Sequence, residues 1–152
     1  MTTRRHFLTS TGSTVAAAAL SSAESTPAPR EKPLLSFGLM ADCQYADADP
    51  AGTRFYRESS GKLAEAVTEL NKHDLAFTCH LGDFIDRDFT SFADLRPIAA
   101  RLRSKLHHVL GNHDFDVEES LRAKVPAELG LTTGTYYAIR RAGFRFLFLD
   151  TT

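Results

Sequence analysis

Three short groups of polar residues carry the side chains in this sequence that could do chemistry. They are Asp42–Gln44, Gly82–Arg87 and Gly111–Asp114. Together they offer carboxylates, amides and one imidazole. Oxygen and nitrogen ligands of this kind suit Mn²⁺, Mg²⁺ or Fe rather than a structural zinc site. Each group alone has the composition of an ordinary turn, so a metal site requires that the three groups lie together.

The segments before these groups explain how they would meet. Each group directly follows a short apolar run that is typical of a buried strand, at 34–41, 75–81 and 107–110. Helical spacing of apolar residues predicts helices over 54–71 and 92–106 between them. Alternating strands and helices predict a parallel sheet with helices on its faces. The carboxyl ends of parallel strands share one edge, so we expect all three groups at one rim of the sheet.

The remaining segments predict smaller elements. Pro97 interrupts the second helix, which places it in a first turn or at a kink. Asp116 and Glu119 have the spacing of a capping box for a short helix. Apolar residues at 136–140 and 144–149 predict a β-hairpin.

The N-terminal residues are typical of a targeting signal rather than of a folded domain. Residues 1–23 combine Arg4 and Arg5, a short Ala-rich stretch and small residues before a cut after Ala23. This pattern predicts a twin-arginine-type signal peptide and therefore an exported protein, periplasmic or secreted, that meets the export machinery. Residues 24–33 are Pro-rich and predict a linker, which leaves 34–152 as the folded part.

Composition excludes several classes of protein. The chain has 152 residues, 43% of them hydrophobic and 24% charged, with a formal net charge of −1. A balance so close to zero argues against nucleic acid or an anionic membrane surface as the main partner. No apolar run approaches the roughly 20 residues that span a bilayer. Two cysteines without C-x-x-C spacing do not form a disulfide framework.

The order of the motifs carries a resemblance. Asp-x-Gln, Gly-Asp-x-x-Asp-Arg and Gly-Asn-His-Asp, in this order, resemble the calcineurin-like metallophosphoesterases. Gln44 departs from the usual His of the first motif and is similar to the manganese-dependent ADP-ribose/CDP-alcohol diphosphatase branch. The stretches 42–47, 54–59 and 107–113 support that branch. The resemblance implies an α/β fold, the N-terminal half of an α/β-β/α sandwich, in which a βαβαβ unit is followed by a β-hairpin.

The resemblance also implies a ligand set for two divalent metal ions. Asp42 and Gln44 would bind the first ion, Asp83 would bridge both, and Asn112 would bind the second. A Gln in place of a His exchanges an imidazole nitrogen for an amide oxygen, which favours Mn²⁺ over zinc. Fe or Mg²⁺ are the alternatives.

Further residues receive roles near the scissile bond. The resemblance implies that His113 acts as general acid or transition-state donor, and that Asp86 accepts a hydrogen bond from its ring. Arg87 would contact phosphate. Tyr45 and Arg57 lie close to the first motif and could line a substrate pocket.

These roles imply a metal-dependent hydrolase that cleaves a small-molecule, nucleoside diphosphate-type substrate. The alternatives are a phosphomonoesterase or phosphodiesterase on the same centre, or an inactive truncated half-domain. The family's later lone His and Gly-His-x-His blocks do not occur before Thr152. We therefore expect this chain to be the N-terminal portion of a longer enzyme and not to be competent alone.

Overall fold

The computed structural model describes residues 32–152, and residues 33–152 form one compact unit. The predicted signal peptide and all but the last two residues of the predicted linker lie outside the described residues. Within the described part, no helix has the length and apolarity that a membrane crossing requires.

A parallel sheet of three short strands forms the centre of this unit. The strands are β1 (Gly38–Met40), β2 (Thr78–His80) and β3 (Leu106–His108), in the order β1-β2-β3. Both strand pairs are parallel, which confirms the predicted sheet. Each strand is shorter than its apolar run, because the chain turns into a loop soon after the hydrogen-bonded pairs end.

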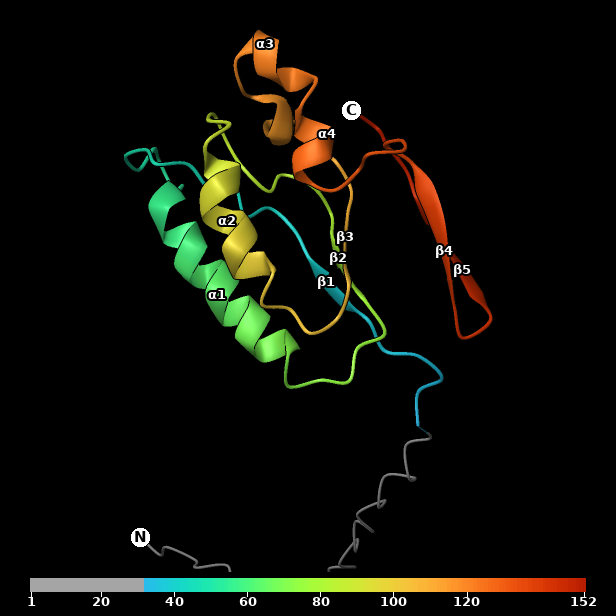
Figure 1. The fold of residues 1–152 in the computed structure, drawn as a ribbon. Coiled ribbons are helices and arrows are strands. Elements are labelled where there is room, and N and C mark those ends of the chain that lie inside the picture. The colour runs from blue at the N-terminus through green and yellow to red at the C-terminus, as the bar shows by residue number, and fades with distance from the viewer. Residues whose placement is uncertain (1–31) are drawn as a thin grey trace, which may run out of the picture. The chain divides into compact units, whose positions relative to one another are not determined.

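Two helices cover one face of the sheet, as Figure 1 shows. A 3-10 turn, η1 (Tyr56–Glu58), leads into α1 (Ser59–Leu70), and α2 (Ser91–Ala99) follows β2. The prediction that the second helix continues to 106 is wrong, since Leu106 begins β3. Pro97 lies near the end of α2 and not in its first turn.

The opposite face of the sheet carries the predicted β-hairpin, which is confirmed (Figure 1). It consists of β4 (Tyr137–Arg141) and β5 (Phe144–Phe148), joined antiparallel. Ala142 and Gly143 both have positive φ, as a two-residue type I′ turn requires. Phe146 and Phe148 pack edge-on against Phe77, which leads into β2.

Three short helical segments connect β3 to the hairpin. They are η2 (His113–Phe115), α3 (Glu119–Arg122) and α4 (Val125–Glu128). The predicted capping box is wrong, because Glu118 is the N-cap of α3 and no side chain caps it. Asp116 is instead the C-cap residue of η2, a position that brings it beside His113.

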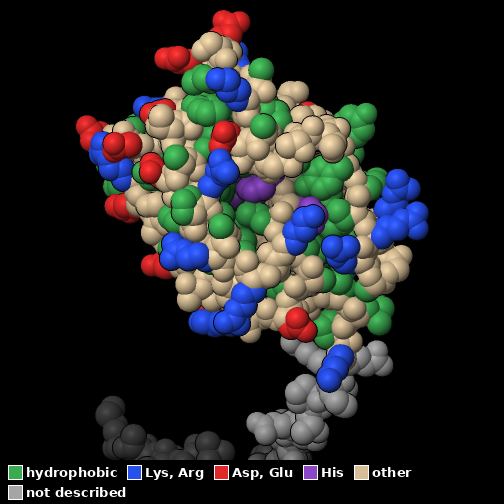
Figure 2. All heavy atoms as spheres, in the orientation of Figure 1, with side chains coloured by type: hydrophobic (Ala, Val, Ile, Leu, Met, Phe, Trp, Pro, Cys, Tyr) green, Lys and Arg blue, Asp and Glu red, His purple; other side chains and the backbone are tan. Residues whose placement is uncertain are grey.

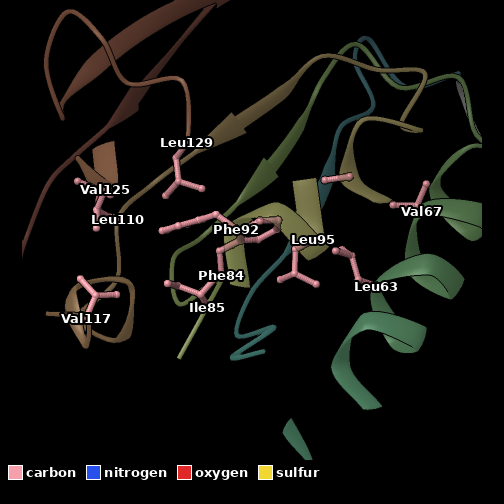
Figure 3. Close-up of a cluster of buried hydrophobic side chains, with 11 residues drawn as sticks. Leu63, Val67, Phe84, Ile85, Phe92, Leu95, Leu110, Val117, Val125 and Leu129 are labelled. Carbon is pink, nitrogen blue, oxygen red and sulfur yellow. The ribbon is translucent and has the colours of Figure 1, made fainter. Parts of the chain in front are cut away.

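The main core joins the helices to the loops that follow the strands. Phe84 and Ile85, from the loop after β2, are 1% and 0% exposed and pack with Phe92 and Leu95 of α2 (Figure 3). This loop also contains Asp83 and Asp86, one residue to either side of the buried pair. Burial of the two apolar side chains therefore fixes the backbone that presents both carboxylates.

Candidate metal centre

Backbone hydrogen bonds join the loop after β1 to the loop after β2. The N–H of Gln44 donates to the carbonyl oxygen of Asp83 at 2.9 Å, and the N–H of Asp86 donates to that of Tyr45 at 2.8 Å. The loop after β3 joins them, since the N–H of His113 donates to Oδ1 of Asp83 at 3.0 Å. The predicted convergence of the three loops at one rim of the sheet is confirmed.

Three of the four predicted metal ligands have a left-handed backbone. The φ angles of Asp42, Gln44 and Asp83 are 56°, 43° and 57°. A side chain in this region of φ costs of order 1 kcal/mol, and such residues cluster at functional sites. Strain at three neighbouring positions indicates that the fold fixes the direction of these side chains at the cost of some stability.

Asp83 lies at the centre of the converging loops and bonds to both of its neighbours there. Its Oδ2 accepts a hydrogen bond from Nε2 of Gln44 at 3.2 Å, and its Oδ1 accepts from the backbone of His113. With its nitrogen engaged, Gln44 has its amide oxygen left for a cation. Gly111 makes this packing possible, because a Cβ at that position would lie 2.1 Å from Oδ1 of Asp83.

The side chain of Asp114 connects the loop after β2 to the loop after β3. Its side chain is fully buried and accepts hydrogen bonds from the N–H groups of Asp83, Phe84, Ile85 and Gly111, at 2.8 to 3.2 Å. Burial raises the pKa of this carboxyl group, while the hydrogen bonds from the loop backbones oppose that rise. The sequence reasoning gave Asp114 no role, although its place in the Gly-Asn-His-Asp motif was the available signal.

His113 lies between two carboxylates. Its Nδ1 is 3.3 Å from Oδ2 of Asp116 and 3.5 Å from Oδ1 of Asp86. The second contact agrees with the expected Asp86–His113 pair in position, but it does not meet hydrogen-bond geometry, and Nδ1 is buried without a hydrogen-bond partner in the described residues. The three side chains are close enough to share a cation. Asp116 is a site residue that the sequence reasoning missed.

Two guanidinium groups face Asp86 from the outer side. Nη1 of Arg54 is 3.5 Å from its Oδ2, and Nε of Arg87 is 3.9 Å from its Oδ1. Arg87 also lies over the ring of Tyr56, with 4.6 Å to the centroid, and donates to its hydroxyl. Both arginines remain about half exposed. Arg54 was not among the predicted site residues, although it begins the stretch 54–59 that carried part of the resemblance.

Two residues expected near substrate are engaged elsewhere in this structure. The hydroxyl of Tyr45 donates to Asp94 of α2 at 3.1 Å, and burial and this bond raise its pKa. The guanidinium of Arg57 forms ion pairs with Asp47 and Asp49, which raise its pKa. Arg57 therefore contacts the segment that follows Gln44. Substrate roles for Tyr45 and Arg57 stay predictions.

One hollow borders the first loop, and a larger one lies beside β3. One of about 90 Å³ is lined by Asp42 and Gln44 on one side and by Arg54, Phe55 and Tyr56 on the other. A larger hollow of about 390 Å³, lined by Lys105, His107, His108 and Tyr137 among others, lies beside β3 and away from these ligands. Histidine atoms are visible in a recess of the face drawn in Figure 2. The smaller hollow is lined by two of the four candidate ligands, Asp42 and Gln44.

Negative charge gathers around the first loop. The pKa of the Cys43 thiol is raised to about 12 by its burial and by the charges of Asp114 and Asp42. Burial is the larger cause of this shift, and the smaller one, the charge of Asp114 and Asp42, also attracts a cation. Asn112, the fourth predicted ligand, is exposed at the start of η2, and no other described side chain occupies its amide.

Two buried imidazoles lie beneath the loops, side by side on neighbouring strands. His80 pairs in register with His108, and both rings pack edge-on against Phe84. Neither ring nitrogen of His80 has a partner in the described residues. Burial and the neighbouring His108 lower the pKa of His80 to about 3, and burial and His107 lower that of His108 to about 4.

These imidazoles should make the protein sensitive to acid. Histidine has a pKa of about 6.5 in the unfolded chain. Below that pH the two imidazoles bind protons in the unfolded chain but stay neutral in the folded one, so stability is lost as pH falls. We expect the free energy of unfolding to fall by up to about 1.4 kcal/mol per pH unit for each imidazole between pH 6 and 4. Urea unfolding at several pH values should show that the unfolding free energy of His80→Phe falls clearly less steeply with falling pH than that of the wild type. The exposed His73→Gln variant is the control, and equal slopes in all three proteins would contradict the prediction.

Comparison with known proteins adds independent findings. Residues 35–148 match the family model described as calcineurin-like phosphoesterase. The manganese-dependent ADP-ribose/CDP-alcohol diphosphatases of Xenopus tropicalis and Danio rerio are 37% and 36% identical to the chain over 100 and 99 residues, each covering 56% of it. A solved dimetal phosphatase from Danio rerio superposes with a TM-score of 0.56 at 30% identity, over 76% of the chain.

The matches cover only part of the similar proteins. The chain spans 29% and 30% of the two diphosphatases, and 44% of the solved phosphatase.

Proposed function

This chain belongs to the calcineurin-like phosphoesterase family, and from that membership we propose that it hydrolyses phosphoester or diphosphate bonds with two divalent metal ions. The observation that carries the proposal is the convergence of Asp42, Gln44, Asp83 and His113 in one set of hydrogen-bonded loops. The similarity to manganese-dependent diphosphatases favours Mn²⁺ as the ion, and a nucleoside diphosphate-type molecule such as ADP-ribose as the substrate.

The donor set fits hard divalent cations. Asp42 and Asp83 offer carboxylate oxygens, and Gln44 and Asn112 offer amide oxygens. When bound, such ions supply Lewis-acid activation of water and of the phosphoryl group. Neighbours orient both oxygens of Asp83, the residue that would contact both ions.

The other residues of the site act on the substrate. His113 would donate a proton or a hydrogen bond to the leaving oxygen, and Asp86, whose Oδ1 lies 3.5 Å from Nδ1 of His113, would position the ring. Arg87 and Arg54, both half exposed beside Asp86, can contact the negative charge of a phosphate. This arrangement supports an in-line displacement at phosphorus with assistance to the departing group.

The test separates metal binding from turnover. Calorimetric titration with Mn²⁺ should show binding, and Asp83→Asn should weaken it at least tenfold, since the variant loses a charged ligand. Asp88→Asn is a matched control in the same loop, because its carboxylate bonds only the N–H of Thr90. Incubation of the full-length protein with ADP-ribose and Mn²⁺ should release AMP.

Three results would redirect the assignment. Phosphate release from an aryl phosphate with ADP-ribose untouched favours a phosphomonoesterase. Mn²⁺ binding without turnover favours the inactive half-domain. Equal Mn²⁺ affinities of the wild type and Asp83→Asn would remove the basis of the metal centre.

We also propose that the protein is exported through the twin-arginine route to the periplasm or the medium. Arg4 and Arg5, followed by an Ala-rich stretch, support the proposal. Fractionation of cells that express the wild type and an Arg4→Lys/Arg5→Lys variant tests it, with retention of the variant as the expected result. Equal export of both would contradict it.

A further inference from the structure

The hollow of about 390 Å³ beside β3 is separate from the candidate metal centre. Every residue that lines it lies between Lys105 and Ile139, and none of them is a candidate ligand. Its volume falls within the range of about 300–1,000 Å³ that is typical of sites for small molecules. Figure 2 shows histidine side chains in a recess that lysine and arginine side chains border. The chemistry of the walls therefore decides what the hollow can hold.

One wall is the free edge of β3, which pairs with β2 on its other side only. The carbonyl oxygen of Lys105 and the N–H of Val109 bond to β2. Because the backbone groups of successive residues in a strand point to alternate sides, those of Leu106 and His108 point to the hollow that they line. The hydroxyl of Tyr137 donates to the carbonyl oxygen of His108 at 2.8 Å. The N–H groups of Leu106 and His108 therefore serve as donors on this wall.

Two imidazoles on the same strand bring further polar atoms to the hollow. His107 is 7% exposed, and its Nε2 is buried without a hydrogen-bond partner in the described residues. The same holds for Nδ1 of His108. Buried polar atoms in proteins are almost always hydrogen-bonded, so two such atoms beside one hollow point to a polar ligand.

The charge around the hollow is positive. Lys105 is the single charged residue of the lining, and Arg141 lies at the end of β4. Within residues 32–152, neither cation forms an ion pair. Burial lowers the pKa of His107, and the charges of Lys105 and Arg141 lower it further, so both cations act on the same imidazole. A field that disfavours another positive charge at this place favours an anion.

The remaining wall is apolar. Leu129 and Leu131 come from the segment after α4, and Ile139 comes from β4. A matching ligand therefore combines an anionic group with an apolar body. One lysine in the lining balances a single negative charge, which fits a carboxylate better than the nearly double charge of a phosphate.

We propose that the hollow beside β3 binds a small organic carboxylate with a compact apolar body. The carboxylate accepts hydrogen bonds from Lys105 and from the free edge of β3, and the apolar body packs against Leu129, Leu131 and Ile139. No metal ion and no phosphate takes part. The proposal is therefore independent of the proposed function, and neither fails with the other.

Titration of the full-length protein with benzoate, without added metal, tests the proposal. Calorimetry should show saturable binding with a Kd on the order of 1 mM or lower. Two further probes separate the parts of the ligand, since acetate has the charge without the ring and benzyl alcohol has the ring without the charge. Both should bind at least tenfold more weakly than benzoate. In nitrogen-15 NMR spectra, benzoate should shift the amide signals of Leu106, His108 and Leu131.

Substitution of Lys105 tests the electrostatic part. Lys105→Met should weaken benzoate binding about tenfold, because the variant keeps the apolar stem and loses the charged donor. Lys105 is exposed, so the variant should fold as the wild type does, and its amide spectrum checks this. Lys124→Met is the matched control, since this exposed lysine precedes α4 and does not line the hollow. Its affinity for benzoate should equal that of the wild type.

Four outcomes would overturn the proposal. No saturable binding of benzoate would mean that water alone occupies the hollow. Equal affinities for benzoate and acetate would reduce the site to surface charge, and equal affinities for benzoate and benzyl alcohol would reduce it to an apolar groove. Amide shifts confined to the loops after β1 and β2 would place the carboxylate at the candidate metal centre instead.

Discussion

Asp114→Asn should lower the free energy of unfolding by about 3 kcal/mol or more and abolish Mn²⁺ binding. The wild-type carboxylate accepts hydrogen bonds from two loops, with Oδ1 serving Phe84 and Ile85 and Oδ2 serving Asp83 and Gly111. An amide keeps one acceptor oxygen and places an NH₂ group against backbone donors on the other side. The loops would then separate at the point where the candidate ligands meet.

Urea unfolding followed by circular dichroism measures the effect of this substitution. Asp116→Asn is the control, an exposed carboxylate two residues along, and its stability should stay within about 0.5 kcal/mol of the wild type. A loss below about 1 kcal/mol in Asp114→Asn would show that the buried carboxylate does not hold the loops together.

Gly111→Ala should also remove metal binding, by a steric route. The new Cβ would lie 2.1 Å from Oδ1 and 2.3 Å from the backbone nitrogen of Asp83, so the loop after β2 must move. Overpacking of this kind costs about 1–3 kcal/mol, and it displaces the carboxylate expected to bridge the two ions.

Gly61→Ala in α1 provides the comparison, since nothing lies within 4 Å of a Cβ there. Alanine favours the helix, so this variant should gain about 0.5 kcal/mol and bind Mn²⁺ as the wild type does. Mn²⁺ titration and urea unfolding of both variants check the pair. Normal Mn²⁺ affinity in Gly111→Ala would mean that Asp83 is not a ligand.

The arrangement of strands and loops could be predicted because it follows from local pattern. Each apolar run ended directly before a polar group, and parallel pairing of β1, β2 and β3 then brought Asp42, Asp83 and His113 to one rim. The boundaries could not be predicted as well. Leu106 continues the apolar spacing of α2, but pairing with Thr78 makes it a strand residue. The spacing of apolar residues reports only local structure, so it does not show that pairing with a neighbouring strand outweighs the helix there.

The network around the ligands could not be predicted, because it depends on residues about 30 positions apart. Nothing local shows that Asp114 accepts from the backbone of Phe84, or that Arg54 reaches Asp86. Asp116 had the spacing of a capping box with Glu119, and that interpretation concealed its approach to His113. A 3-10 turn and an N-cap both use short polar side chains, so residue type alone did not distinguish them.

The left-handed backbone at Asp42, Gln44 and Asp83 has a consequence for any attempt to engineer this protein. Glycine adopts such φ values without penalty, so selection for heat resistance alone would favour glycine at these positions. Each such gain would delete a candidate ligand, and at Asp42 and Asp83 it would also remove a negative charge that attracts cations. Stability against heat and the proposed metal binding therefore make opposite demands on the same three residues. A library for stabilising this protein should leave them constant and vary the surface of α1 instead.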